Sequence, residues 1–132
     1  MKRFFIIVAT AIVVSFALGA KPKKLTSTLK WDVTPEGVLH ITGTGDMPDW
    51  PAPQGEAWYK DGKWQKIHRI EIGEGVTSIG FKSFSPVGSE FQRAQPLELM
   101  LPSTLVEIGD FSFKNTPIKS LSLPEGLKRI GL

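Results

Sequence analysis

Apolar residues recur along the second half of the chain in a pattern that is repeated three times. The copies span residues 72–80, 101–109 and 123–131. Each copy reads as an apolar residue, then Gly or Pro, two further residues, Val or Leu, two more residues, and a closing Ile-Gly. The copies start 29 and 22 residues apart (101−72 and 123−101). A repeat of about 20–29 residues built on spaced Leu and Ile is typical of a solenoid, in which each repeat forms one coil.

The spacing within one repeat predicts a strand followed by a turn. Apolar residues two positions apart, which point to the same side of an extended strand, are Ile70 and Ile72, Leu99 and Leu101, and Leu121 and Leu123. Gly or Pro then turns the chain, and Phe84 and Phe113 fill the interior. Because no coil can bury these residues alone, the coils should stack and their strands should join into a parallel sheet. We therefore predict that Ile70, Leu99 and Leu121 are stacked neighbours in the core.

Residues 25–66 do not follow this repeat. Residues 29–33 and 38–42 alternate as two strands around Pro35-Glu36-Gly37, which is a hairpin signal. End units of a solenoid are atypical because they shield the core from water. The sequence thus predicts a β-rich fold, a short parallel β-solenoid of leucine-rich repeats with an N-terminal β-hairpin cap. Residues 21–66 form the cap region, and residues 67–132 form two full repeats and a partial third. Residues 85–96, rich in Pro, Gly and Ser, are expected to form a surface loop.

The first 20 residues have the layout of a secretory signal peptide. Lys2 and Arg3 precede an apolar run over residues 4–18, and the small residues Gly19 and Ala20 follow. The alternative is an uncleaved anchor, but a run of this length is short against the roughly 20 residues that cross a bilayer. We therefore expect cleavage near residue 20, export, and a secreted or cell-surface location. The lysines that follow, within residues 21–24, are expected to form a solvated tail.

Charge and cysteine content exclude several classes of protein. The formal net charge of the whole chain is +3, but without residues 1–20 it is +1, from 14 basic and 13 acidic residues. This near-neutral balance, without a basic stripe, argues against a nucleic-acid partner. The chain has no cysteine, so an exported form has no disulfide and depends on packing for stability.

The repeats and the cap together resemble the BspA-like leucine-rich repeat surface proteins. The likeness rests on residues 101–113, which run from Leu-Pro through Ile-Gly to a Phe-Ser-Phe, and on the cap residues 29–31, 37–48 and 58–59. Ser83 and Ser112 stand where the family usually has Ala, and Lys82 stands where an aromatic residue is common. The resemblance implies a non-catalytic secreted or cell-surface protein that mediates protein binding or adhesion to host or neighbouring-cell macromolecules.

The side of the strands opposite the core is the first candidate binding surface. Two columns are expected to align across successive repeats, namely Arg69, Glu98 and Ser120, and Glu71, Met100 and Ser122. Such ladders line the open face that repeat proteins use for recognition. The alternative interpretation is an ordinary solvated sheet face.

A cluster of aromatic residues in the cap is the second candidate. Trp31, Trp50, Trp58, Tyr59 and Trp64 all lie there. Exposed aromatic faces can stack on sugars or contact proteins, which makes a carbohydrate-binding module the alternative function. The other interpretation is that these rings seal the first coil. Trp50, between prolines, is the one expected to stay exposed.

The sequence predicts no catalytic residue, cofactor or metal site. His40 and His68 lie within predicted strands, without a partner at metal-ligand spacing and outside any nucleophile motif. Asp46, Asp49 and Glu56 offer oxygen ligands for calcium, but their spacing matches no calcium loop. We interpret them as solvated loop carboxylates.

The last repeat stops at Gly131-Leu132 without a capping unit. Its apolar side chains are therefore expected to be partly exposed, namely Leu121, Leu123, Leu127, Ile130 and Leu132. An exposed apolar end favours self-association. A shortened remnant of a longer repeat protein is a further alternative.

Overall fold

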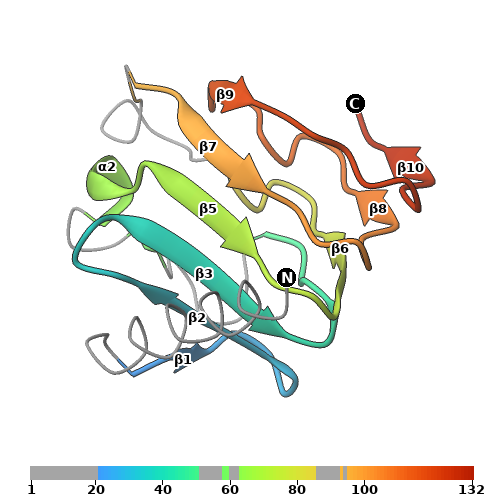
Figure 1. Ribbon diagram of the computed structural model, residues 1–132, viewed down its shortest axis with the longest axis horizontal. Helices are drawn as coiled ribbons and strands as arrows, with labels where there is room; N and C mark the ends of the chain where they lie inside the picture. Colours follow the sequence, from blue (N-terminus) through green and yellow to red (C-terminus); the bar gives the residue numbers. More distant parts are fainter. Residues whose placement is uncertain (1–20, 51–57, 60–62, 86–92, 94) are drawn as a thin grey trace, which may run out of the picture.

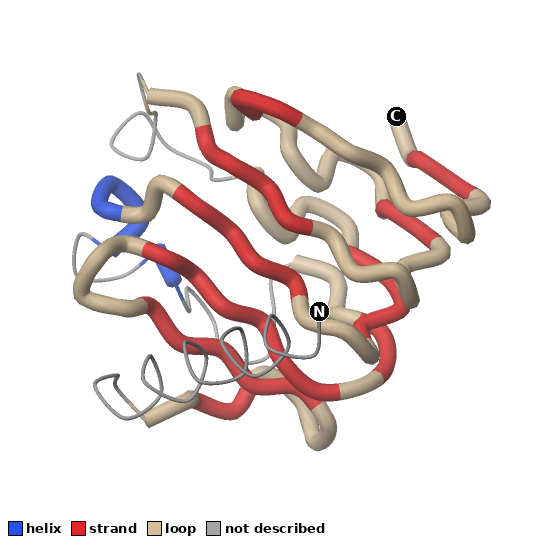
Figure 2. Tube along the Cα trace, in the orientation of Figure 1, coloured by secondary structure: helices blue, strands red, loops and turns tan. Residues whose placement is uncertain are grey.

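The chain winds through two sheets that lie along the length of a short solenoid (Figures 1 and 2). The computed structural model describes residues 21–50, 58–59, 63–85, 93 and 95–132. The six-stranded sheet has the order β1 (Lys23–Lys24), β2 (Leu29–Val33), β3 (Val38–Gly43), β5 (Arg69–Ile72), β7 (Leu97–Met100) and β9 (Ile118–Ser120). The four-stranded sheet has the order β10 (Arg129–Ile130), β8 (Glu107–Ile108), β6 (Val76–Ile79) and β4 (Gly45–Asp46). Among the described residues, a short helix, α2 (Lys63–Lys66), precedes β5.

The predicted cap hairpin is confirmed and is continuous with the repeat sheet. Strands β2 and β3 are antiparallel, and β3 then pairs in parallel with β5. In that pairing Leu39 lies opposite Ile70, and Ile41 lies opposite Ile72. The hairpin therefore shields the first coil by adding strands to its sheet, and its inward residues continue the apolar columns of the repeats.

The predicted stacking of the repeats is confirmed between the first two units. Ile70 lies opposite Leu99 in the parallel pairing of β5 and β7. Leu121 follows β9, beyond a register shift in the pairing of β7 with β9, and its side chain is 53% exposed. Among the described residues, β9 is the last strand of its sheet, so no strand covers Leu121 from the other side.

Aromatic rings run through the interior along the stacking direction. The rings of Trp58 and Phe84 stack at 5.4 Å between centroids, and those of Phe84 and Phe113 stack at 5.3 Å. Trp58 and Phe84 are fully buried, and Phe113 packs against the core from a half-buried position. The interior role expected for both phenylalanines is therefore confirmed.

The Ile-Gly step lets successive coils approach closely. A Cβ on Gly80 would lie 2.1 Å from the carbonyl oxygen of Pro48 in the preceding coil. The serines that follow the Ile-Gly steps, Ser83 and Ser112, bridge the coils. The hydroxyl of Ser112 lies 2.9 Å from the carbonyl oxygen of Gly80 and 2.6 Å from that of Gly109. Ser83 repeats this arrangement toward Pro48 and Gly80. Each serine thus places a hydrogen-bond donor at backbone carbonyls between the coils.

The expectation of a solvated N-terminal tail is wrong for two of its residues. Lys23 and Lys24 form β1, which pairs antiparallel with β2, and Leu25 is fully buried. The side chains of both lysines are exposed, but their backbone pairs with β2. Charged side chains are therefore compatible with a strand at the edge of the sheet. The proposed signal peptide, residues 1–20, and Glu56 lie outside the described residues. Among the residues that are described, no helix has the length and apolar character that crossing a membrane requires.

Most of the predicted surface loop, residues 86–92 and 94, also lies outside the described residues. Arg93 is described, and it joins the loop to the helix. Its guanidinium donates to the carbonyl oxygens of Trp64, at 2.6 Å, and Ile67, and it lies over the indole ring of Trp64. Burial lowers the pKa of Arg93. These hydrogen bonds add a donor to the carbonyl of Trp64 within α2, which also accepts from the backbone N–H of Ile67 at 3.3 Å, and a donor to the carbonyl of Ile67 just after the helix.

Candidate binding surface

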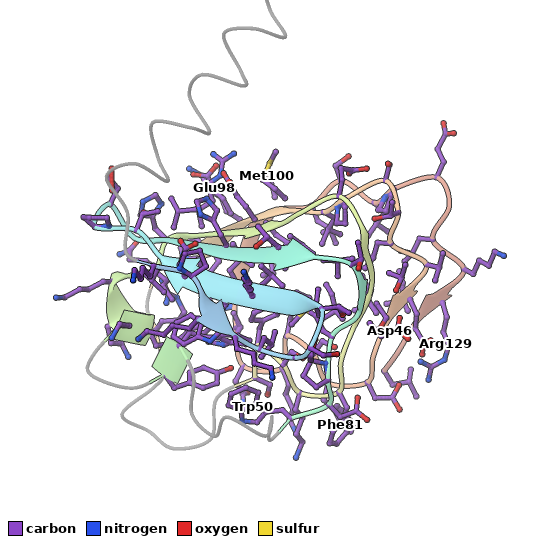
Figure 3. All side chains as sticks on the ribbon, turned by 90° about the horizontal axis from the view of Figure 1, so that it is seen from below. Asp46, Trp50, Phe81, Glu98, Met100 and Arg129 are labelled. Atoms are coloured by element: carbon purple, nitrogen blue, oxygen red, sulfur yellow. The ribbon has the colours of Figure 1, made fainter. Side chains whose placement is uncertain are left out.

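The outward side chains of the six-stranded sheet form one continuous surface, which we call the outer face. It carries Asp32, His40, Arg69, Glu71, Glu98, Met100 and Ser120. Figure 3 shows Glu98 and Met100 projecting from the same side of the molecule, away from Trp50 and Phe81.

The structure places the first predicted column in register. Arg69 lies opposite Glu98, and Glu98 lies opposite Ser120. In the second column Glu71 lies opposite Met100. Ser122 lies beyond the end of β9 and belongs to no strand. The sequence therefore identified most of the outward positions of the repeats, because strand residues alternate between faces with a period of two.

The columns extend into the cap hairpin. We predicted the hairpin from the sequence, but not this extension. Val38 lies opposite Arg69 and His40 lies opposite Glu71, while Asp32 lies opposite His40 on the other side. The outer face therefore spans five strands, from β2 to β9. Part of this extension is predictable from the sequence, because the length of a short hairpin turn fixes which residues of its two strands lie opposite each other.

A row of ionic contacts crosses the outer face. His40 Nδ1 lies 3.2 Å from Asp32 Oδ1, and His40 Nε2 lies 3.0 Å from Glu71 Oε1. Arg69 Nε lies 2.7 Å from Glu71 Oε2, and Arg69 Nη1 lies 3.9 Å from Glu98 Oε2. These contacts join β2, β3, β5 and β7. His40, expected to be an ordinary strand residue, is therefore the centre of the row.

The contacts change the acid–base properties of the two central groups. The hydrogen bond to Glu71 raises the pKa of His40, and the nearby Asp32 carboxylate acts in the same direction, while burial opposes both. The hydrogen bond from His40 lowers the pKa of Glu71, and Arg69 adds to this effect. The row is therefore most stable with His40 as a cation and Glu71 as an anion.

Met100 is an exposed apolar residue of the outer face, at the end of β7. Its side chain is 50% exposed beside Glu98, whereas the neighbouring inward residues Leu97 and Leu99 are buried. Flexible thioether side chains adapt to irregular partner surfaces. The outer face thus combines an apolar contact point with charged groups of both signs.

The cap aromatics seal the interior. Trp31, Trp58, Tyr59 and Trp64 are all buried, and the phenol of Tyr59 donates to the carbonyl oxygen of Ser83 at 2.9 Å. Burial raises the pKa of Tyr59. These four rings cannot stack on a sugar in this conformation.

Trp50 was expected to stay exposed, and it is half-buried. Its ring packs at 5.4 Å from Trp58 and 5.3 Å from Tyr59, so it extends the cap cluster to the surface. It lies on the side away from Glu98 and Met100 (Figure 3). The structure therefore does not bring Trp50 together with the outer-face columns.

The four-stranded sheet carries a second outward surface that sequence reasoning missed. The repeated spacing predicts only the apolar positions of these strands, Val76, Ile79 and their equivalents. On the outward side lies a groove of about 670 Å³. It is lined in part by one in-register column, Asp46, Ser78, Glu107 and Arg129.

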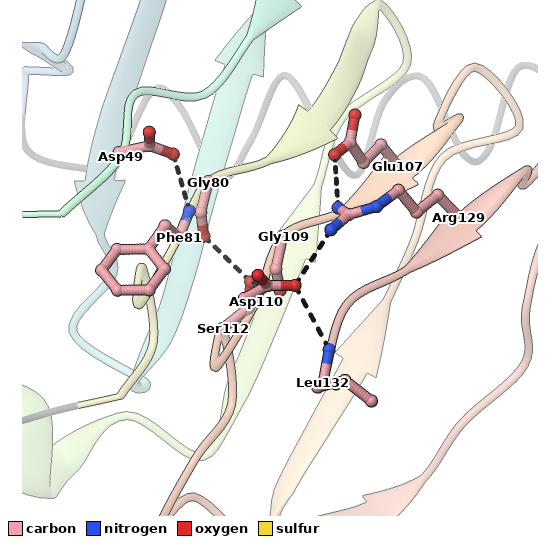
Figure 4. A network of polar contacts seen from close by, with 9 residues as sticks. All are labelled: Asp49, Gly80, Phe81, Glu107, Gly109, Asp110, Ser112, Arg129 and Leu132. Atoms are coloured by element: carbon pink, nitrogen blue, oxygen red, sulfur yellow. Dashed lines mark hydrogen bonds and ion pairs between the residues drawn. The ribbon is translucent and has the colours of Figure 1, made fainter.

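The charged groups of this groove bind to one another and to backbone. Arg129 donates to Glu107 at 2.6 Å and to Asp110 at 3.0 Å, and Asp49 accepts from the backbone N–H of Phe81 at 2.8 Å (Figure 4). Asp46 accepts from the Thr77 hydroxyl at 2.6 Å. Both aspartates considered for calcium thus connect β4 and its following loop to the first repeat. In the described part of the chain, no three His, Asp or Glu side chains are grouped to hold a metal ion.

The second histidine also has a structural contact. His68 Nε2 lies 2.7 Å from the carbonyl oxygen of Glu36, and its backbone N–H donates to Gly37. This joins the hairpin turn to the start of β5.

Comparison with known proteins agrees with this architecture. A family profile described as "BspA type Leucine rich repeat region (6 copies)" matches residues 62–132. A solved structure of a leucine-rich repeat protein from Eubacterium ventriosum superposes with a TM-score of 0.66 at 32% sequence identity. The alignment covers 85% of this chain and 28% of that one, so the chain spans less than a third of its relative. No curated protein matches the chain significantly.

The profile covers more than half of the sequence, and the folded repeats reproduce the strands, the Ile-Gly steps and the interior phenylalanines on which the resemblance rests. Repeats of this family are typical of proteins that interact with other proteins rather than of enzymes. The chain belongs to the BspA-type leucine-rich repeat family.

Proposed function

We propose that this chain is a non-catalytic, exported protein that binds another protein through its outer face, in adhesion to a host or neighbouring cell. The observation that carries the proposal is the in-register alignment of outward side chains from Asp32 in the cap to Ser120 in the last described strand of the sheet. Stacked repeats present such columns on a rigid frame, which reduces the entropy lost on binding.

The chemistry of the outer face supports a protein partner. Met100 offers an exposed apolar contact opposite Glu71, and Arg69 and Glu98 add charges of both signs on the same face. Interfaces commonly combine an apolar centre with a polar rim, and charges at the rim set orientation and association rate. The burial of the cap aromatics leaves the carbohydrate-binding alternative with Trp50 as its one partly accessible tryptophan among the described residues.

Export is supported by the sequence outside the described residues. The basic start, the apolar run over residues 4–18 and the small residues at 19 and 20 match a signal peptide. Edman sequencing of the mature protein from the culture medium or cell envelope tests this part. A mature chain starting at or next to Lys21 supports it, and retention of Met1 contradicts it.

The binding role is tested with charge-matched variants. The double variant Glu98→Lys/Met100→Lys alters the part of the outer face that β7 carries. The double variant Glu125→Lys/Val106→Lys makes the same change in charge, one Glu and one apolar residue to Lys, at exposed positions elsewhere. Fluorescently labelled protein is added to epithelial cells and to neighbouring bacterial cells, and bound protein is measured by flow cytometry. We expect binding to fall at least tenfold in the first variant only. Equal binding by both variants would show that the outer face is not the binding surface.

A further inference from the structure

His40 connects the cap hairpin to the first repeat through two carboxylates. Its ring nitrogens lie 3.2 Å from an oxygen of Asp32 on β2 and 3.0 Å from an oxygen of Glu71 on β5. A neutral imidazole has one N–H and can donate only once, whereas an imidazolium donates from both nitrogens. Carboxylates accept hydrogen bonds and donate none when ionised. Both contacts can therefore exist together as hydrogen bonds only when His40 is protonated.

The groups that face His40 determine which contact survives loss of the proton. From β2 these are Asp32, which lies directly opposite, and Lys30, which lies two residue pairs further along the same face; from β5 they are Glu71 and Arg69. Asp32 is only 5% exposed, and its Oδ2 has no hydrogen-bond partner in the described part of the protein. Glu71 is over a third exposed and keeps its contact with Arg69.

A buried carboxylate that loses its donor pays a larger desolvation cost than an exposed carboxylate, which water can solvate. Neutral His40 is therefore expected to keep its proton on Nδ1, toward Asp32, and to present a lone pair to Glu71. A lone pair facing a carboxylate oxygen is repulsive, so the contact with Glu71 is the one that breaks.

We propose that His40 is a pH-dependent switch of the outer face: as a cation it holds Glu71 against the cap hairpin, and as a neutral ring it releases Glu71 toward solvent. The raised pKa of His40, caused first by its hydrogen bond to Glu71, agrees with this arrangement. The proposal concerns regulation of the binding surface, so its biological consequence rests on the proposed function, but the switch itself does not.

The switch changes the charge that the outer face presents. With His40 protonated, the three carboxylates of the row and its two cations, His40 and Arg69, leave a net charge of −1. Loss of the proton makes this −2 and leaves Glu71 with Arg69 as its ionic partner in the row. A partner with a basic surface is then attracted more strongly at higher pH, since complementary charge raises association rates.

Nitrogen-detected NMR of the histidine side chains tests the switch without any ligand. The chain has two histidines, so a His68→Asn variant assigns the signals of His40. We expect both ring nitrogens of His40 to be protonated at pH 6, a titration midpoint above the ordinary 6.5, and a neutral form with the proton on Nδ1. The Glu71→Gln variant should shift the midpoint to lower pH. The Glu98→Gln variant, which removes the same charge one strand further away, should shift it far less.

Three results would overturn the proposal: a His40 midpoint at or below 6.5 in the wild-type protein, equal shifts in both glutamine variants, or a neutral form protonated on Nε2. The wild-type titration is decisive by itself if a variant fails to fold. Loss of the proposed binding role in the cell assay would leave this titration unchanged, so the failures of the two proposals are distinguishable.

Discussion

Trp58 is the side chain whose removal should destabilise the protein most clearly. It is fully buried, and its ring lies between Trp31, at 5.8 Å, and Phe84, at 5.4 Å, so it connects the cap to the interior of the first repeat. Truncation of a buried Trp to Ala costs about 3–5 kcal/mol, which includes the cavity that remains. The whole stability of such a domain is about 5–15 kcal/mol. The Trp58→Ala change therefore removes a large share of it.

Urea unfolding followed by far-UV circular dichroism measures the loss in free energy of unfolding, and a thermal scan of the same signal measures the melting temperature. At roughly 4 °C per kcal/mol for a domain of about this size, the melting temperature should fall by about 12–20 °C. Trp58→Phe, which keeps an aromatic ring, should lose less and stays measurable if the alanine variant does not fold. Met100→Ala is the control, since truncation of an exposed side chain changes stability by about 0.5 kcal/mol or less.

If Trp58 binds sugar, the opposite result is expected. It predicts unchanged stability and lost glycan affinity, which a glycan array on the same variants measures. A Trp58→Ala protein with the wild-type unfolding midpoint would refute the conclusion that this ring seals the first coil.

Three further outcomes are expected. Gly80→Ala should lower the free energy of unfolding by about 1–3 kcal/mol, because its Cβ would meet the preceding coil. Gly126→Ala is the control and should be tolerated, because its Cβ has no atom nearer than 3.8 Å. The same urea titration measures both variants. The melting temperature should be highest between pH 4.5 and pH 6.5, which are the ordinary pKa values of a Glu and a His side chain. Because folding lowers the pKa of Glu71, the stability from this residue is lost as the pH falls through its folded-state pKa. Because folding raises the pKa of His40, the stability from this residue is lost as the pH rises through its folded-state pKa. A melting temperature that does not change with pH would contradict both statements. A polypeptide of residues 21–132 should self-associate in sedimentation velocity runs, and Leu121→Lys should reduce this, because the apolar side chains of the last coil are exposed; a monomer at all concentrations would contradict it.

The repeated spacing of apolar residues was sufficient to predict the stacked coils and the outward columns of the repeats. A strand alternates its side chains with a period of two, and equal repeat positions occupy equal places in successive coils. The pairing of Arg69 with Glu98, and of Ile70 with Leu99, follows from these two rules alone. The hairpin was equally accessible, since its turn and both its strands are adjacent in sequence.

The contact between His40 and Glu71 required the tertiary structure. These residues are 31 positions apart, and their pairing depends on how the cap hairpin lies against β5, which the spacing of the repeats does not specify. The same holds for Arg93, whose contacts cross from a loop to α2. Local pattern predicts which side of a strand a residue occupies, but not which non-repeating strand lies beside it.

The four-stranded sheet and its groove also could not be predicted from local sequence pattern. β4, β8 and β10 contain two residues each, too few for an alternating pattern to be recognised in the sequence. Their pairing arises because the Ile-Gly steps bring successive coils into contact, where backbone N–H groups such as that of Gly109 meet the carbonyl of Ile79 at 2.8 Å. The sequence by itself determined the coil and its inward side chains. Only the stacking of the coils decided which polar side chains became neighbours, because those contacts form between segments that the chain brings together in space.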